Sequence, residues 1–194
     1  MAASLNPLRP QDINRLGIAR TFQNIRLFSE LSVLDNVRVA FHHRIGYSLL
    51  DSVLDGKIFR EEESKIRAEA LTLLEQFHLK GLRDELAKNL SYGDQRRLEM
   101  VRALATRPKL LLLDEPAAGM NASEKRDLIE LIRRLHQELK LAILLIEHDM
   151  AVVMNLCPRI LVLDYGVPIA EGNPDEIRGN PKVIEAYLGE KARH

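Results

Sequence analysis

The sequence LLLLDEP at residues 110–116 places four aliphatic residues directly before two carboxylates and a proline. A continuous apolar run of this length is typical of a central parallel strand that is covered on both faces. Pro116 cannot extend a strand ladder, so the chain must turn directly after the carboxylates. Open α/β sheets bind ligands beyond the carboxyl ends of their strands. Asp114 and Glu115 therefore stand where such a sheet would hold a ligand.

These residues alone leave two interpretations of Asp114 and Glu115 open. In the first, Asp114 holds a magnesium ion, directly or through water, and Glu115 orients or deprotonates an attacking water. In the second, the strand simply ends in a polar turn.

The segments around this strand predict an α/β fold with a parallel sheet. Residues 31–92 have mostly helical periodicity, and the apolar positions of residues 128–139 mark a long amphipathic helix. Asn121 can cap this helix, with Glu124 three residues on as in a capping box. Apolar runs at 142–146 and 159–163 predict two further buried strands, the second followed by a turn at Tyr165-Gly166. For residues 1–14 we expect a loop or the end of a truncated unit.

Composition excludes several classes of protein. The chain has 28 lysines and arginines and 28 aspartates and glutamates, so its formal net charge is zero. A neutral chain gives no reason to expect a nucleic-acid partner. The single cysteine, Cys157, cannot form an internal disulfide and fits a reducing compartment. No apolar run approaches the roughly 20 residues that span a bilayer. These features favour a soluble cytoplasmic chain.

Three more segments carry side chains suited to a nucleotide site. The first is LSYGDQRR at residues 90–97, where Ser91 can cap the following helix and Gly93 permits close approach of an anion. Alternatively, Ser91 and Asp94 form a capping box that binds no ligand. His148 follows the predicted strand 142–146, and Gln23 follows a short extended segment. Either could instead be an ordinary surface residue.

The order and spacing of these segments resemble the nucleotide-binding subunits of ABC transporters over essentially the whole chain. Residues 21–23 are similar to the family's Q-loop and residues 90–95 to its signature motif. Residues 110–115 resemble the Walker B strand, residues 118–121 the D-loop, and His148 the switch histidine.

Longer stretches narrow the resemblance to the larger ATPase subunit of branched-chain amino-acid importers. They are GIARTFQNIRLF, LSYGDQRRLE, LDEPAAGMN, LLIEHDM and NPDEIRGNPKVIEAYLGE, together with a long insert at residues 42–62. Related importers of urea or short amides share much of this pattern and remain an alternative.

The resemblance implies a P-loop NTPase core with a parallel sheet and an α-helical subdomain. It divides the chain into four parts. Residues 1–28 are the rest of the N-terminal core with the Q-loop, and residues 29–90 are the helical subdomain. Residues 91–165 are the second part of the core, and residues 166–194 are a C-terminal extension. It also implies that Glu115 and His148 are catalytic, and that Asp114 holds Mg²⁺ with Gln23 contacting the ion through water. The residues implied in ATP binding are Gln23, Ser91, Tyr92, Gly93 and Asn121.

Partners follow from the same resemblance. In this family two ATPase subunits face each other, and each ATP lies between one subunit's phosphate loop and the other's signature motif. The implied partners are a second ATPase subunit, permease subunits and, indirectly, a periplasmic binding protein. The implied location is peripheral, on the cytoplasmic face of the inner membrane.

The sequence departs from the family pattern at three places. Asp94 stands where the signature commonly has glutamine, and we expect its side chain to turn back onto Ser91. Asn121 replaces the usual D-loop aspartate, so it can donate and accept hydrogen bonds but cannot form an ion pair. None of the ten glycines begins the phosphate-loop pattern G-x-x-x-x-G-K-[ST]. We therefore expect either that the intact protein starts upstream of Met1 or that the chain is a non-hydrolysing binding module.

Without a phosphate loop, the 194-residue chain by itself should neither bind Mg-ATP tightly nor hydrolyse it, because the lysine and the cradle of backbone N–H groups are missing. Titration calorimetry of the isolated chain with Mg-ATP tests this expectation. A dissociation constant in the micromolar range would contradict it.

Overall fold

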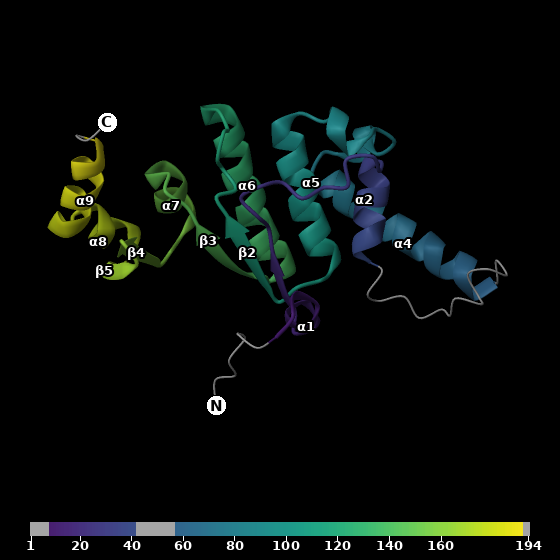
Figure 1. Cartoon of the computed structure of the whole chain (residues 1–194), viewed down its shortest axis with the longest axis horizontal. Coiled ribbons are helices and arrows are strands. Elements are labelled where there is room, and N and C mark those ends of the chain that lie inside the picture. The colour runs from purple at the N-terminus through teal and green to yellow at the C-terminus, as the bar shows by residue number, and fades with distance from the viewer. Residues whose placement is uncertain (1–7, 42–56, 192–194) are drawn as a thin grey trace. The chain divides into compact units, whose positions relative to one another are not determined.

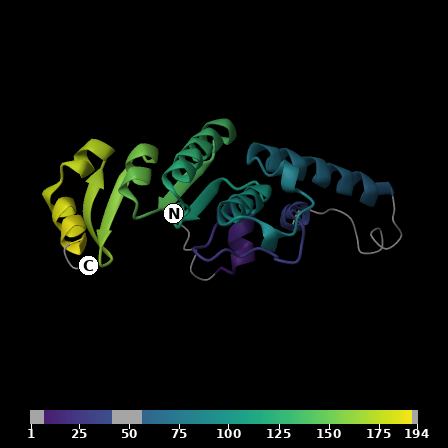
Figure 2. The same cartoon turned by 90° about the horizontal axis from the view of Figure 1, so that it is seen from above.

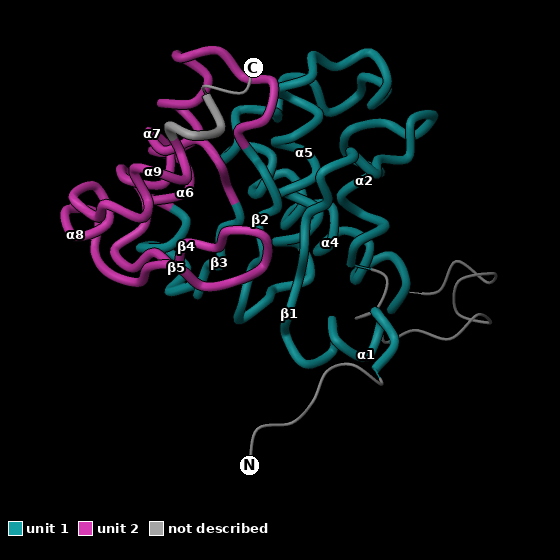
Figure 3. The backbone as a smooth tube through the Cα atoms, turned by 60° about the vertical axis from the view of Figure 1, so that its left-hand side comes forward, with its two compact units in different colours: residues 1–116, 135–146 teal, residues 117–134, 147–194 magenta. Residues whose placement is uncertain are grey.

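The computed structural model describes residues 8–41 and 57–191, so most of the insert expected at residues 42–62 lies outside the described residues. The chain divides into two compact units, which Figure 3 colours teal and magenta. The first contains residues 1–116 and 135–146, and the second contains residues 117–134 and 147–194.

A three-stranded parallel sheet lies in the first unit, in the order β1-β2-β3 (Figure 1). The strands are β1 Ile18–Arg20, β2 Leu110–Asp114 and β3 Ala142–Ile146. β2 is the central strand, and its Leu111 and Leu113 are completely buried. The predicted parallel sheet and its strand at residues 110–113 are therefore confirmed.

β3 is less buried than its apolar sequence predicts. Leu144 and Ile146 are 55% and 53% exposed. Successive side chains of a strand point to opposite faces, and one face of β3 is open in the described part of the first unit. An apolar run identifies a strand, but it does not reveal how many of the strand's faces are covered.

Helices of the first unit pack beside this sheet, and Figure 2 shows α2, α4 and α5 from above. Val37, Leu74 and Leu98 supply one fully buried side chain from each of these three helices. The helices are α1 Pro10–Arg15, α2 Val33–Ala40, α4 Lys57–Gln76 and α5 Tyr92–Ala105, with short 3₁₀ segments at Lys80–Leu82 and Ala87–Asn89.

Helix α1 corrects the expectation of a loop at residues 1–14. Pro10 occupies the first helical position, where its fixed φ suits a helix and its missing N–H leaves no bond unmade. Arg9 also bonds Asp12 in the first turn, with 3.1 Å between Nε and Oδ2.

The second unit contains a two-stranded antiparallel sheet rather than another parallel strand. β4 Ile160–Asp164 and β5 Val167–Gly172 are joined by Tyr165 and Gly166 at φ 45° and 80°. Two consecutive positive φ values match the tight turn that joins hairpin strands. The predicted turn is confirmed, but the prediction of a buried strand at 159–163 is wrong, since Leu161 and Leu163 are more than half exposed.

Three helices pack on this hairpin around a small apolar core of Ile160, Ile177 and Val183. The C-terminal segment thus packs back onto the hairpin of its own unit. The helices are α7 Met150–Leu156, α8 Pro174–Arg178 and α9 Pro181–Lys191, and α6 Ala122–Leu139 begins in the same unit. None of the helices in the described ranges has the length and apolar character needed to cross a membrane.

Asp149 caps α7 and also pairs with α6. Its Oδ1 accepts from the amides of Ala151 and Val152 at 2.9 and 3.2 Å, and its Oδ2 lies 2.5 Å from Lys125 Nζ. The hydrogen bond from Lys125 holds the pKa of Asp149 below its ordinary value, and the two amides add to this effect against partial burial. The ionised carboxylate therefore stabilises the fold above the unfolded-state pKa, and this contribution disappears as pH falls through the lower folded-state pKa.

Asp149→Ala should reduce the free energy of unfolding by about 1 kcal/mol at neutral pH, the usual loss for an N-cap. Asp149→Asn keeps the capping oxygen and loses only the pair with Lys125, so it should be milder. The free energy of unfolding can be measured with urea at several pH values between 7 and 3. The difference in this free energy between wild type and Asp149→Asn should shrink below about pH 4. A difference that stays constant over this range would contradict the ion-pair contribution.

Candidate functional site

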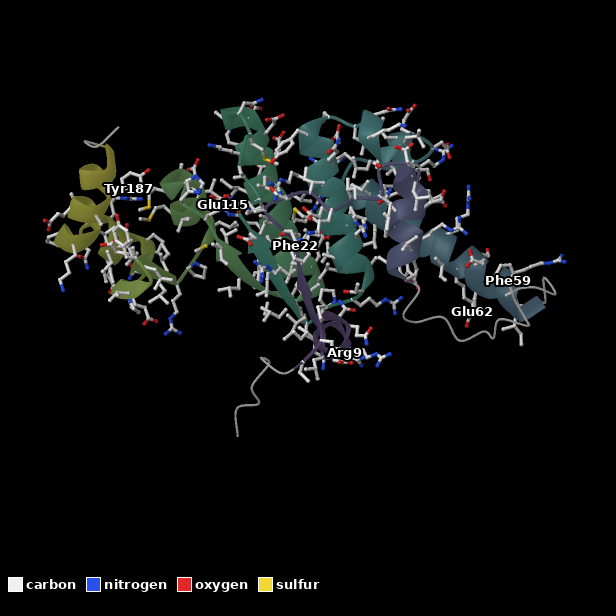
Figure 4. All side chains as sticks on the ribbon, viewed as in Figure 1. Arg9, Phe22, Phe59, Glu62, Glu115 and Tyr187 are labelled. Carbon is white, nitrogen blue, oxygen red and sulfur yellow. The ribbon has the colours of Figure 1, made fainter. Side chains whose placement is uncertain are left out.

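Two pairs of polar side chains lie at the carboxyl ends of β1 and β2. Gln23 Nε2 donates to Glu115 Oε2 at 2.9 Å, and Arg20 Nη2 lies 2.8 Å from Asp114 Oδ2. Thr21 joins the two segments, since its amide donates to the carbonyl of Leu112 at 2.9 Å. Parallel pairing brings the carboxyl ends of both strands to one edge, where Figure 4 labels Phe22 and Glu115. Gln23, Asp114 and Glu115 therefore lie together at this edge of the sheet and form one cluster.

Glu115 has a backbone conformation that is uncommon for a residue with a side chain. Its φ is 46°, in the left-handed region. The conformation is held by a bond from the Glu115 amide to the carbonyl of Ile146 at 2.9 Å, and by the buried Pro116 that follows. Such strained residues concentrate at functional sites.

The oxygen atoms of this cluster fit a magnesium nucleotide. Mg²⁺ is usually bound through one or two carboxylates together with phosphates and water. Asp114 and Glu115 supply two carboxylates, and Gln23 can offer its amide oxygen because its Nε2 is the atom that bonds Glu115. Within residues 8–41 and 57–191, no group of three or more His, Cys, Asp or Glu side chains is placed to hold a metal ion.

The segment that precedes α5 is organised as a helix cap. Ser91 Oγ donates to Asp94 Oδ2 at 2.7 Å and accepts from the Asp94 amide at 3.2 Å. Asp94 thus turns back onto Ser91, as predicted. Ser91 and Tyr92 are exposed and Gly93 is half-buried, so this end of α5 is open to a ligand.

Arg96 of α5 is a buried residue that the sequence reasoning missed. Its Nη1 donates to the carbonyl of Phe22 at 2.8 Å, and its Nη2 donates to the carbonyl of Gln23 at 2.5 Å. The same guanidinium donates to the hydroxyl of Tyr92 at 2.8 and 3.1 Å and lies 3.5 Å from Glu99. The signal in the sequence is a row of charged residues three apart, at positions 96, 99 and 102, which are neighbours on the surface of the helix.

Glu99 is the buried partner of Arg96. Its Oε1 accepts from the amide of Phe22 at 3.2 Å. Burial raises the pKa of Glu99, while the amides of Phe22 and Arg26 and the charges of Arg96 and Arg102 oppose that rise. The buried pair therefore holds the backbone at residues 22–26 against α5.

His148 and Asn121 belong to the second unit, where a second missed residue, Glu147, organises their segments. The side chain of Glu147 is only 1% exposed and accepts from the amides of Ala117, His148 and Asp149 at 2.9, 3.1 and 3.3 Å. The side chain of His148 is 75% exposed.

Asn121 forms the predicted cap of α6. Its Oδ1 accepts from the amides of Ser123 and Glu124 at 2.9 and 3.1 Å. Glu124 Oε2 accepts in return from the Asn121 amide at 2.8 Å, which completes the capping box. The residue that replaces the usual D-loop aspartate thus has a clear structural role.

Comparison with known proteins agrees with this arrangement. A family model described as ABC transporter matches residues 4–118, and one described as branched-chain amino acid ATP-binding cassette transporter matches residues 167–193. The high-affinity branched-chain amino acid transport ATP-binding protein LivG of Escherichia coli K12 is 47% identical over 186 residues, which cover 96% of this chain and 73% of LivG. BraF of Pseudomonas aeruginosa, described in the same words, is 45% identical over 92% of this chain and 70% of its own length.

Solved structures of the same class superpose on the chain. The ADP conformation of MJ1267, an ATP-binding cassette of an ABC transporter, matches with a TM-score of 0.76 and 32% identity over 94% of this chain and 72% of MJ1267. A nucleotide-free ATP-binding cassette from an ABC transporter gives a TM-score of 0.73 and 33% identity over 93% of this chain and 72% of its own length. The resemblance seen in the sequence is confirmed: the chain belongs to the ABC transporter family, as an ATP-binding cassette.

Proposed function

We propose that this protein binds and hydrolyses ATP to energise an importer of branched-chain amino acids. The observation that carries the proposal is the cluster of Gln23, Asp114 and Glu115 at the carboxyl edge of the parallel sheet. The match over residues 167–193 and the names of LivG and BraF support the class of substrate.

In the proposed mechanism the three residues of the cluster have separate roles. Asp114 holds Mg²⁺, which when bound neutralises charge on the phosphates of ATP. Glu115 orients the attacking water and accepts its proton, and Gln23 fixes the Glu115 carboxylate through the 2.9 Å bond. Arg20 offsets the charge of Asp114 when no cation does so.

Residues outside the cluster complete the proposed site. Ser91, Tyr92 and Gly93 contact the nucleotide held by a second ATPase subunit, because free N–H groups at the start of a long helix favour a phosphate. Asn121 hydrogen-bonds across that dimer, and His148 contacts the terminal phosphate and the attacking water.

The proposal includes the setting of the protein. Its partners are a second ATPase subunit and permease subunits at the cytoplasmic face of the inner membrane, with a periplasmic binding protein as an indirect partner. The same proposal divides the chain into four parts. They are two core segments at residues 1–28 and 91–165, a helical subdomain at residues 29–90 and a C-terminal extension at residues 166–194. Because no residue of this sequence supplies a phosphate-loop lysine, tests of hydrolysis require the protein purified with its transporter from its own cells.

Glu115→Gln should abolish steady-state ATP hydrolysis while leaving nucleotide binding intact, because the amide cannot accept the proton of the attacking water. Phosphate release and retention of labelled ATP, measured on the purified transporter, test the two halves of this expectation. Glu30→Gln is the matched control, since Glu30 is an exposed surface residue paired with Lys88. Undiminished turnover in Glu115→Gln would remove Glu115 from its proposed role.

Transport by the reconstituted complex decides the substrate. Proteoliposomes with ATP on the cytoplasmic side should accumulate labelled leucine, and unlabelled isoleucine and valine should compete while urea and acetamide should not. Glu115→Gln proteoliposomes provide the background, because they should not couple ATP to uptake. Accumulation of urea or amides without leucine would contradict the proposed substrate and leave the ATPase assignment standing.

A further inference from the structure

The backbone at residues 21–28 has no helix or strand of its own to satisfy its hydrogen-bonding groups. Buried backbone N–H and C=O groups nevertheless need partners. Side chains of α5 supply them in the middle of this segment: Arg96 donates to the carbonyls of Phe22 and Gln23, and Glu99 accepts from the amide of Phe22. Asn36 of α2 bonds the amide and the carbonyl of Phe28 at the far end. The conformation around Phe22 and Gln23 therefore depends on a helix that lies more than 70 residues away in the sequence.

A third residue of α5 continues the same row. Arg102 donates to the carbonyl of Arg26, and its guanidinium lies 4.8 Å from the ring centroid of Phe28. Residues three apart on a helix are neighbours on its surface, so positions 96, 99 and 102 form a continuous strip along the loop. Arg96 and Glu99 are only 4% and 6% exposed, so their interactions are shielded from water.

Arg96 also connects this loop to the signature segment. The guanidinium that bonds the carbonyl of Gln23 bonds the hydroxyl of Tyr92, and Gln23 in turn bonds Glu115 through its side chain. A planar group with donors in a fixed fork permits little independent movement of the groups that it bonds. Tyr92, the Gln23 backbone and the Glu115 carboxylate thus form one chain of contacts through Arg96.

From these contacts we infer that Arg96 and Glu99 are positioning residues for hydrolysis: they hold Gln23 on Glu115 and make its position follow that of the signature segment. This inference rests on the proposed roles of Gln23 and Glu115. Neither Arg96 nor Glu99 touches the reacting atoms, and both act through Gln23.

Arg96→Lys is the informative substitution, because it keeps the buried charge beside Glu99 and removes the fork that reaches two carbonyls and Tyr92. In the purified transporter it should lower kcat for ATP hydrolysis by about 10- to 100-fold, the effect of a small misplacement of a catalytic group. KM for ATP should change by no more than about twofold, since uniform binding is not altered. Arg107→Lys is the matched control, because Arg107 pairs with Glu69 at an exposed position.

A double-mutant cycle with Gln23→Ala separates positioning from a general structural defect. If Arg96 acts through Gln23, Arg96→Lys should have little further effect on kcat in the Gln23→Ala background. Hydrogen exchange should quicken in peptides that cover residues 21–28 and remain unchanged over β2 and β3. Arg96→Met/Glu99→Leu, which removes both buried charges together, should reproduce the loss of kcat if the lysine variant does not fold.

Three results would overturn the inference, in two different ways. An undiminished effect of Arg96→Lys in the Gln23→Ala background, or wild-type kcat in Arg96→Lys, would overturn the positioning role alone. Wild-type hydrolysis in Gln23→Ala would overturn both the positioning role and the proposed role of Gln23.

Discussion

Parallel pairing between β1 and β2 brings together Gln23 and Glu115, which lie 92 positions apart in the sequence. The register aligns Arg20 with Leu112, so that the next residues of both strands emerge at the same edge. A slip of one residue would turn every side chain of β1 to the opposite face. The burial of Ala19, the middle residue of β1 between Ile18 and Arg20, makes such a slip unfavourable, so the geometry of the cluster depends on the packing of this strand.

The buried charges of α5 fix the conformation of the loop that follows β1. An ion pair such as Arg96 with Glu99 is weak support for stability, because removing two charges from water offsets most of their attraction. Its partners here are backbone groups of an irregular segment that could adopt other conformations. The pair therefore contributes conformational uniqueness to a loop whose proposed function requires an accurately placed side chain. Glu147 does the same for the backbone around His148 in the second unit.

Local patterns predicted the parts of the molecule whose causes are local. The apolar run at 110–113, the Asn121 cap with Glu124 and the turn at Tyr165-Gly166 were all visible in the sequence, because their partners lie within a few residues. Arg96 was missed because its backbone partners lie more than 70 residues away, and the row of charged residues on α5 does not reveal them. Glu147 was missed because one of its partners, the amide of Ala117, lies 30 residues away. The pairing of β4 with β5 was not predicted either, because the apolar residues of a strand do not reveal which strand it will pair with.

The left-handed backbone at residue 115 has a consequence for how this protein can change. Glycine is the residue best suited to a φ of 46°, and a carboxylate-bearing residue there retains strain of order 1 kcal/mol or more. Under the proposed mechanism, however, glycine would relieve the backbone and remove the group that activates water. Selection for a more stable fold and selection for turnover therefore favour different amino acids at this one position. The glutamate at this position therefore retains the proposed activity at a cost in backbone stability.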